Sequence, residues 1–435
     1  MANIKILMKA SRLQWSHLLS ALAMSACALS SSWVNANPTA KIKQLQLNDL
    51  ISLALENNAE VQISKNETQA AAGQLSTARA IPNPQFETLR GDQKRQGGSV
   101  STVESLSVTQ PIDMPYMRVP RVNAAEKNLK AIEASELLKR HEIVARVKTR
   151  YYEYIRRVEE LKAANEDLDL TRQIRDRIRL RYQVGETAKF ELIRAETDLL
   201  NVQINTQAAK SRLDQAKAQL RLVVGTKNLP TQFEIKFQDI PKDNLPSLET
   251  LLAEVKAQNP EINRARLQLE SNQSRLSLER NTRLPQLAFK GQENKEPDFT
   301  NRSYGVVVTI PIWDWRIGQV REAAANVARS QNQLNYQTQL LETQLELAYE
   351  QYEISSYQVR TLENEVIQQA TDARRIAEAS FRFGERGLLE YLDAQRTLRA
   401  ARADLIRAKF ELASIIIEIE RLRANPDNLI VKANP

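Results

Sequence analysis

The feature that most constrains this chain is an internal duplication with a spacing of about 200 residues. Residues of the first half recur in the same order in the second half, at offsets that drift only from 201 to 199. Chance explains isolated matches, but an ordered and nearly gapless series indicates two copies of one structural unit. The matched pairs include Leu47 and Leu248, Asn58 and Asn259, Pro84 and Pro285, Pro111 and Pro311, Ala124 and Ala324, Gly185 and Gly384, and Glu191 and Glu390.

Both halves show the same order of predicted elements. An amphipathic helix ends at a proline-containing turn, and two strand-like runs separated by a polar loop follow. A very long helix then runs to a glycine turn, after which a last helix closes the half. The helices are predicted at 47–81 and 247–283, the loops at 91–99 and 292–301, the long helices at 116–183 and 314–383, the turns at Gly185 and Gly384, and the ends of the last helices at about 224 and 423.

These elements predict five segments along the chain. They are a signal peptide (1–36), a first repeat (37–225), a linker (226–246), a second repeat (247–424) and a C-terminal tail (425–435). The chain contains only 11 Gly and 15 Pro among 435 residues, so few turns are available and long elements are expected.

Composition excludes several classes of protein. The mean hydropathy is −0.47, and no stretch after the N-terminal region approaches the roughly 18 apolar residues that a spanning helix needs. One Cys and two His exclude a disulfide scaffold and disfavour Cys- or His-dependent enzymes. No nucleophile, base and orienting group stand out, so we expect neither an enzyme nor a cofactor.

The N-terminus predicts export from the cytoplasm. Three basic residues precede an apolar stretch at 18–29, and Ala36 ends a small-residue cleavage site, so the mature chain is expected to begin at Asn37. Alternatively, the residues around Cys27 resemble a lipoprotein box and Cys27 becomes a lipidated N-terminus. Removal of 3 of the 61 basic residues leaves 58 against 53 acidic ones, a net charge near +5. This mild, dispersed charge argues against a nucleic-acid partner.

The long helices have coiled-coil spacing, which requires partner helices. About 70 residues span roughly 105 Å, twice the roughly 52 Å of a 35-residue helix, so we predict that the last and first helices of each half stack end to end beside the long one. Such a rod is too thin to bury a core, and assembly side by side is expected. The predicted rows are Val144, Val147, Tyr151, Tyr154, Val158 and Leu161, and Leu341, Leu345, Ala348, Tyr352, Ser355, Val359, Leu362, Val366, Gln369, Ala373, Ile376, Ser380 and Phe383.

The four strands match outer-membrane barrel strands in length and alternation. Four strands are too few to close a barrel, and open edges do not persist in lipid, whereas three copies supply twelve strands. A small soluble sheet capping a coiled coil is the alternative.

The sequence resembles the TolC-type outer-membrane efflux channels. The resemblance lies in the twofold repeat, in the strand-to-helix segments 108–112 and 308–312, each followed by Arg and paired Ala, and in the turns at 181–186 and 381–385. Within that family, 110–115 with Arg118 and Arg121 looks most like the outer-membrane members of cobalt, zinc and cadmium efflux systems.

The resemblance implies a mainly α fold with a small β part: a homotrimer with a twelve-stranded barrel in outer-membrane lipid and a coiled-coil helical tunnel in the periplasm. It implies a periplasmic adaptor and a proton-driven inner-membrane pump of the RND type as partners, with 226–246 and the tail forming a belt around the tunnel. The implied cargo is heavy-metal cations. A duct for drugs or for protein secretion is an alternative within transport, and a periplasmic coiled-coil protein without a pore is the alternative from another class.

The resemblance also implies a periplasmic entrance beyond the second glycine turn. Glu390 and Asp393 lie at i and i+3 on one helix face, where the family carries carboxylates, and three copies would make a ring that attracts cations. The first half has Glu191 and Arg194 at these positions. Arg386 matches a family position that holds the entrance shut, and it would pair with Glu191 or Glu186 beside Gly185, Gly384 and Glu385. The alternative interpretation is solvated charges that the helix dipole favours.

Soft metal ligands are scarce in the mature chain. His141, Met114 and Met117 are the His and Met residues that remain, and no Cys follows Cys27. Transition-metal sites need clusters of such ligands, so we predict no metal site and assign metal selectivity to the pump and adaptor. The two methionines could contact copper, but packing is the favoured interpretation, and His141 is predicted to lie on the surface.

Overall fold

The computed structural model describes residues 44–94, 96–98, 100–225, 229, 233–237 and 245–424. The chain divides into Met1–Lys43 and Gln44–Pro435, and the described residues belong to the second unit. The predicted signal peptide, its cleavage site after Ala36 and Cys27 lie outside the described residues.

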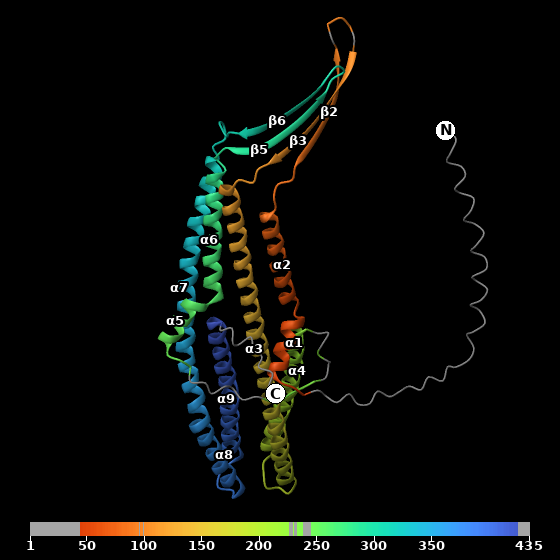
Figure 1. The fold of residues 1–435 in the computed structure, drawn as a ribbon. Helices are drawn as coiled ribbons and strands as arrows, with labels where there is room; N and C mark the ends of the chain where they lie inside the picture. The colour runs from red at the N-terminus through yellow and green to blue at the C-terminus, as the bar shows by residue number, and fades with distance from the viewer. Residues whose placement is uncertain are drawn as a thin grey trace, which may run out of the picture. The chain divides into compact units, whose positions relative to one another are not determined.

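The unit Gln44–Pro435 contains two copies of one order of elements (Figure 1), which confirms a mainly helical, duplicated fold with a small β part. Two short strands, β1 (Gln44–Leu45) and β4 (Glu234–Ile235), pair in parallel. The first copy consists of α1 (Leu47–Asn57), α2 (Ala59–Arg79), β2 (Gln85–Lys94), β3 (Val100–Pro111), α3 (Pro115–Gln183) and α4 (Lys189–Val224). The second consists of α5 (Leu248–Gln258), α6 (Pro260–Asn281), β5 (Gln286–Lys295), β6 (Thr300–Thr309), α7 (Ile317–Thr361), the π-helix η1 (Leu362–Val366), α8 (Ile367–Arg382) and α9 (Leu388–Arg423).

The four long strands form one antiparallel sheet in the order β2-β3-β5-β6. On the face that carries Phe86 and Tyr304, which are 73% and 76% exposed, the part nearer the helices is apolar. Farther from the helices, the same face carries ion pairs of Arg90 with Glu104 and of Arg302 with Glu293. The opposite face is polar, and Asn294 Oδ1 there accepts hydrogen bonds from Ser105 Oγ at 2.7 Å and Gln292 Nε2 at 2.9 Å. Strand pairing continues into the polar residues predicted as loops, because the backbone ladder does not require apolar side chains. Among the described residues, the edge strands β2 and β6 each have one partner only.

The prediction of continuous helices over 47–81 and 247–283 was wrong, because each is interrupted by an asparagine. Asn58 and Asn259 have extended backbones and cap α2 and α6, accepting hydrogen bonds from the backbone N–H groups two residues later, at 2.8 and 2.7 Å. Each side-chain amide also donates to a carbonyl at the end of the last helix of its half, Val223 at 2.9 Å and Leu422 at 2.7 Å. The two asparagines therefore join the stacked helices, α4 to α2 and α9 to α6.

Replacing Asn58 by Ala is expected to lower the free energy of unfolding by about 2 kcal/mol, since it removes an N-cap and leaves a buried carbonyl without its donor. Asn259→Ala should have an equal effect. Asn57→Ala is the matched control, because the Asn57 side chain donates only to the carbonyl of Leu53 on an exposed face. Thermal unfolding followed by circular dichroism measures the difference, and equal midpoints for Asn57→Ala and Asn58→Ala would contradict this role.

The second long helix is interrupted by η1, and this corrects the predicted coiled-coil row. Leu341, Leu345 and Ser355 are buried as predicted. Beyond η1, however, Ile376 and Phe383 are 64% and 81% exposed, whereas Ala370 and Phe381 are buried. A π-turn inserts one extra residue, so the buried row moves by one position and the strict alternation fails after Leu362. In the first half, Val144, Val147, Tyr151 and Tyr154 are buried, as predicted.

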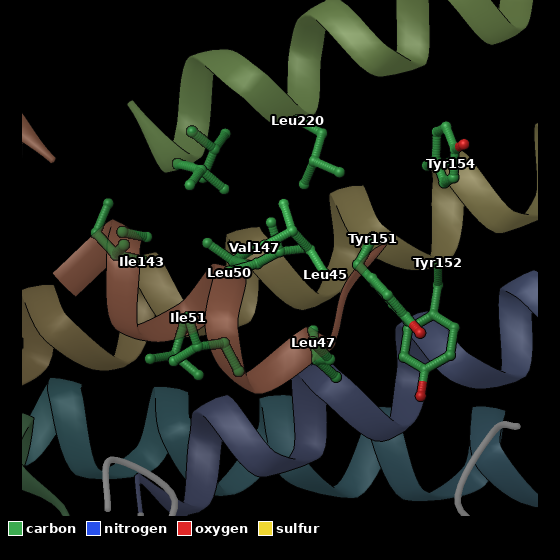
Figure 2. Packing of buried hydrophobic residues seen from close by; sticks show 14 of the residues in the cluster. Leu45, Leu47, Leu50, Ile51, Ile143, Val147, Tyr151, Tyr152, Tyr154 and Leu220 are labelled. Atoms are coloured by element: carbon green, nitrogen blue, oxygen red, sulfur yellow. The ribbon is translucent and has the colours of Figure 1, made fainter. Parts of the chain in front are cut away.

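The largest apolar cluster lies where α1, α3 and α4 meet. Figure 2 shows Leu50 and Ile51 of α1 near Ile143 and Val147 of α3, with Leu220 of α4 on the far side. The Tyr151 hydroxyl donates to the carbonyl of Lys236 at 2.9 Å, which attaches part of the linker to this core. Residues 226–228, 230–232 and 238–244 and the tail 425–435 lie outside the described residues, and the belt stays a prediction.

An aspartate fixes the corner where the first strand pair meets the helices. Asp113 Oδ2 pairs with Arg118 Nη1 at 2.9 Å and Arg121 Nη2 at 2.7 Å. The same two arginines donate to the carbonyls of Arg79 and Ala78, which the end of α2 leaves without helical partners. The Arg118 and Arg121 pattern singled out in the sequence is therefore a structural brace.

Candidate functional site

Each helical hairpin closes in a tight glycine turn. Gly185 and Gly384 have φ values of +81° and +76°, a left-handed region in which other residues are strained. The following N–H groups reach back by the same pattern, Glu186 to the carbonyl of Arg181 at 2.8 Å and Glu385 to that of Ser380 at 2.9 Å. This is the glycine helix end expected of the two repeated turns.

The two turns belong to one packed tip. An apolar cluster joins Ile174 and Ile178 of α3 and Ala195 of α4 to Phe381 of α8 and Leu388, Tyr391 and Leu392 of α9. The rings of Phe381 and Tyr391 stack with centroids 5.7 Å apart, and the Arg181 guanidinium lies 5.4 Å from the centroid of the Phe381 ring. The fold therefore brings the predicted entrance residues of both halves to the same end of the helices.

The two predicted entrance acids, Glu390 and Asp393, lie in the first two turns of α9, and both are exposed. Glu390 Oε2 pairs with Arg386 Nη1 at 2.9 Å on the same helix. Asp393 forms no ion pair with any residue that the structure describes. Both carboxylates are therefore available to solvent beside the tip.

The predicted latch between Arg386 and the first half does not form within one chain. Glu186 Oε2 lies 3.4 Å from Arg181 Nε, and the Thr187 hydroxyl donates to Glu191. Arg386 pairs with Glu390 instead. A latch from Arg386 to Glu186 or Glu191 of another copy remains a prediction.

Sequence reasoning missed a group of buried charges farther from the turns. Arg399 of α9 lies between two carboxylates of the first half: its Nε is 3.2 Å from Asp167 Oδ2 of α3, and its Nη2 is 3.9 Å from Asp198 Oδ2 of α4. The side chains of Asp167 and Asp198 are only 13% and 9% exposed. Asp198 Oδ1 also lies 3.6 Å from Nη2 of the more exposed Arg396. We call Asp167, Asp198 and Arg399 the buried charge cluster. It ties the second-half hairpin to both helices of the first-half hairpin.

The environment of the cluster disfavours charge on Asp167. Burial raises the pKa of the Asp167 carboxyl above its ordinary value, although the charges of Arg399 and Arg402 oppose this rise. Gln395 Nε2 donates to Asp167 Oδ1 at 3.4 Å. Asp198 falls on the same helix face as the buried Ala195 and Val202, so a charge within an apolar row was the signal that could have revealed the cluster.

The soft-ligand residues do not come together as a site. Met114 is the half-buried residue before α3, and Met117 lies in its first turn. Within the described ranges, no three His, Cys, Asp or Glu side chains are grouped so that they could hold a metal ion. His141 is 4% exposed, so the prediction of a surface histidine was wrong. His141 lies on the inner face of α3, in the same buried row as Val144, which is one turn farther along the helix.

His141 is expected to make the helices acid-sensitive. Burial, followed by the charges of Arg140 and Lys148, lowers its pKa to about 4. The pKa of a histidine in the unfolded chain is near 6.5. Between about pH 6.5 and pH 4 the unfolded state therefore binds a proton that the folded state does not bind. This difference lowers the free energy of unfolding by about 3 kcal/mol. In His141→Leu, the drop in thermal midpoint between about pH 7 and pH 4.5 should be smaller than in the wild type. An unchanged drop would contradict a buried neutral histidine.

No helix in the described part of the chain has the length and apolar composition needed to cross a membrane. A model of the family described as "Outer membrane efflux protein" matches residues 50–226 and 251–423, which make up most of the chain. The chain belongs to this family. The two matched ranges fall on the two copies of the duplicated plan.

Relatives and solved structures agree with the family. The chain is 25% identical over 376 residues to the cobalt-zinc-cadmium resistance protein CzcC of Cupriavidus metallidurans, covering 86% of this chain and 88% of that protein. It is 23% identical over 295 residues to the nickel-cobalt-cadmium resistance protein NccC of Alcaligenes xylosoxydans xylosoxydans, covering 65% and 64%. A membrane protein from Pseudomonas aeruginosa has the same fold, with a TM-score of 0.77 at 18% identity over 88% of this chain and 91% of that one.

Proposed function

We propose that three copies of this protein form an outer-membrane exit channel, which conducts heavy-metal cations passively from a periplasmic adaptor and an inner-membrane pump to the outside. The family, the duplicated helical hairpins and the four-stranded sheet support this function. The protein acts as a duct, without a catalytic step.

The sheet carries the argument for a channel. One face has an exposed apolar part next to the helices, the opposite face is largely polar, and the edge strands β2 and β6 lack outer partners within the described residues. Unpaired edges are unstable in lipid, and four strands do not close around a lumen. If β6 of one copy pairs with β2 of the next, three copies close a barrel of twelve strands with the polar face inside.

The residues at the tip of the helices support an entrance on the periplasmic side and a positively charged cargo. The entrance acids Glu390 and Asp393 lie at the end of the helices away from the sheet, where a periplasmic adaptor and an RND pump would dock. Three copies bring six exposed carboxylates together, and such a ring concentrates cations. The named relatives confer resistance to cobalt, zinc, nickel and cadmium, which agrees with a cationic cargo.

A deletion strain tests the cargo. We expect it to become sensitive to cobalt, zinc or cadmium, and the complete gene should restore resistance. If the deletion strain became sensitive to antibiotics but not to metals, the cargo would be drugs and not metal cations. If it lost a secreted protein and became sensitive neither to antibiotics nor to metals, the channel would serve protein secretion.

A further inference from the structure

Equivalent segments of the two halves carry opposite charge. Residues 139–157 of α3 include seven basic and two acidic side chains, whereas the equivalent residues 339–357 of α7 include four acidic and no basic ones. The basic residues are Lys139, Arg140, Arg146, Lys148, Arg150, Arg156 and Arg157, and the acidic residues of α7 are Glu342, Glu346, Glu350 and Glu353. The duplication places both segments at the same level along the helices.

The basic segment borders a groove of about 940 Å³ where α4 ends and α2 begins. Its lining includes Asn58, Arg146, Arg150 and Leu222. Arg146 Nη1 lies 2.5 Å from Glu60 Oε1, but Arg150 donates only to the neutral Gln219, at 2.8 Å. Leu222 is 71% exposed. We call this the basic groove.

The acidic segment forms a ridge on the outer side of α7. Glu346, Glu350 and Glu353 are exposed and form no ion pair in the part of the chain that the structure describes, while Glu342 pairs with Lys256 at 3.0 Å. On the same side, Leu347 and Ile354 are 66% and 59% exposed. Residues 347, 350, 354 and 357 follow coiled-coil spacing, so this face, the acidic ridge, is a seam without a partner helix.

The groove and the ridge lie on opposite flanks of the chain. Helix α2 contacts α3, α3 contacts α6, and α6 contacts α7, which repeats the strand order β2-β3-β5-β6. The basic groove is on the α2 flank and the acidic ridge on the α7 flank. A head-to-tail contact between copies therefore brings opposite charges together at one level, as a closed ring requires.

We propose that the acidic ridge of one copy docks in the basic groove of the next, with Glu346 and Glu350 facing Arg146 and Arg150 and with Leu347 against Leu222. This contact rests on the proposed homotrimer and identifies the surfaces that hold it together. Contacts between two grooves or between two ridges are repelled, so the charges also enforce the head-to-tail order.

Charge reversal tests the contact in the full-length protein, purified in detergent and analysed by native mass spectrometry. Glu346→Lys with Glu350→Lys, and separately Arg146→Glu with Arg150→Glu, should each lower the trimer-to-monomer ratio about tenfold or more, and all four changes together should restore it. Asp404→Lys with Glu411→Lys, two exposed acids of α9, is the charge-matched control and should leave the ratio unchanged.

A disulfide provides a test that does not depend on the stability of the charge variants. Cys27, within the predicted signal peptide, is the only cysteine, so Leu222→Cys with Leu347→Cys should give covalent trimers on oxidation in a Cys27→Ser background. Leu200→Cys with Leu347→Cys should give none, since Leu200 lies about 33 Å along α4 from Leu222. A trimeric wild type without the cross-link and without an effect of charge reversal would overturn the docking alone. A wild type that is not trimeric would overturn the proposed function as well.

Discussion

Replacing Glu390 by Gln and Asp393 by Asn together is expected to lower the cation-over-anion permeability ratio of the single channel about fivefold or more. In the proposed trimer, three copies would contribute six carboxylates to the periplasmic entrance, and a constriction there would concentrate their field on passing ions. The side chains keep their size in this variant, so conductance changes through charge alone. The reversal potential under a salt gradient in a planar bilayer measures the ratio.

The control for this variant neutralises acids remote from the tip, Asp214→Asn on α4 with Glu411→Gln on α9, both exposed. Their selectivity should match that of the wild type. If the entrance variant kept the reversal potential of the wild type, Glu390 and Asp393 would not line the lumen, and their charges would serve only the start of α9.

The second large effect is expected at the buried charge cluster. Arg399→Met removes the ion-pair partner of Asp167, whose side chain is only 13% exposed, whereas Asp198 keeps Arg396, with Arg396 Nη2 3.6 Å from Asp198 Oδ1. Removal of one partner from a buried ion pair costs about 3 kcal/mol, because the remaining charge is desolvated without compensation. We expect a lower thermal unfolding midpoint, and a larger open probability in bilayers, since the cluster ties the two hairpins together.

Two further variants make this prediction specific. Arg402→Met removes a more exposed pair, in which Arg402 Nη1 and Glu166 Oε2 are 3.6 Å apart, and should cost less than about 1 kcal/mol. Adding Asp167→Asn to Arg399→Met should recover most of the lost stability, because Asp167 is then neutral and Asp198 still pairs with Arg396. Equal effects of Arg399→Met and Arg402→Met would show that the cluster does not hold the hairpins.

The duplication made most of the architecture predictable. Once two copies of one unit are recognised, each glycine turn and each proline-ended strand is supported twice, so the limits of α3, α4 and α9 were close to those observed. The chance that both halves mislead in the same way is small. The place of Glu390 and Asp393 beside the tip followed from their distance from Gly384, whereas their role as entrance acids came from the family resemblance and stays a prediction.

Periodicity alone could not predict the departures from regular helices. The 4-3 spacing continues through Ile376 and Phe383, and the row beyond η1 is interrupted only by the polar Gln369 and Ser380. Each lies directly before a residue that is buried instead, Ala370 and Phe381, but two polar positions were too weak a signal to predict the inserted residue. Asn58 and Asn259 each precede a glutamate by two residues, which is a sign of a helix start. The helical pattern on both sides of each asparagine nevertheless favoured one continuous helix. Their partners at Val223 and Leu422 depend on tertiary contacts.

Buried charge was the least predictable property. His141 lies among Lys139, Arg140 and Glu142, a composition typical of a solvated face, yet the inner face of α3 contains it. Arg399 is likewise one of several arginines on α9, and the sequence around it does not distinguish it from the others. Only the pairing of three helices shows that it lies between two carboxylates.

The central claim is that this chain forms a cation-conducting channel through the outer membrane. The most direct test is the current across a planar lipid bilayer after addition of the purified full-length protein. We predict discrete conductance steps from a trimer, with a reversal potential that shows cation preference. A protein recovered from the soluble periplasmic fraction as a monomer, without conductance in the bilayer, would contradict the account.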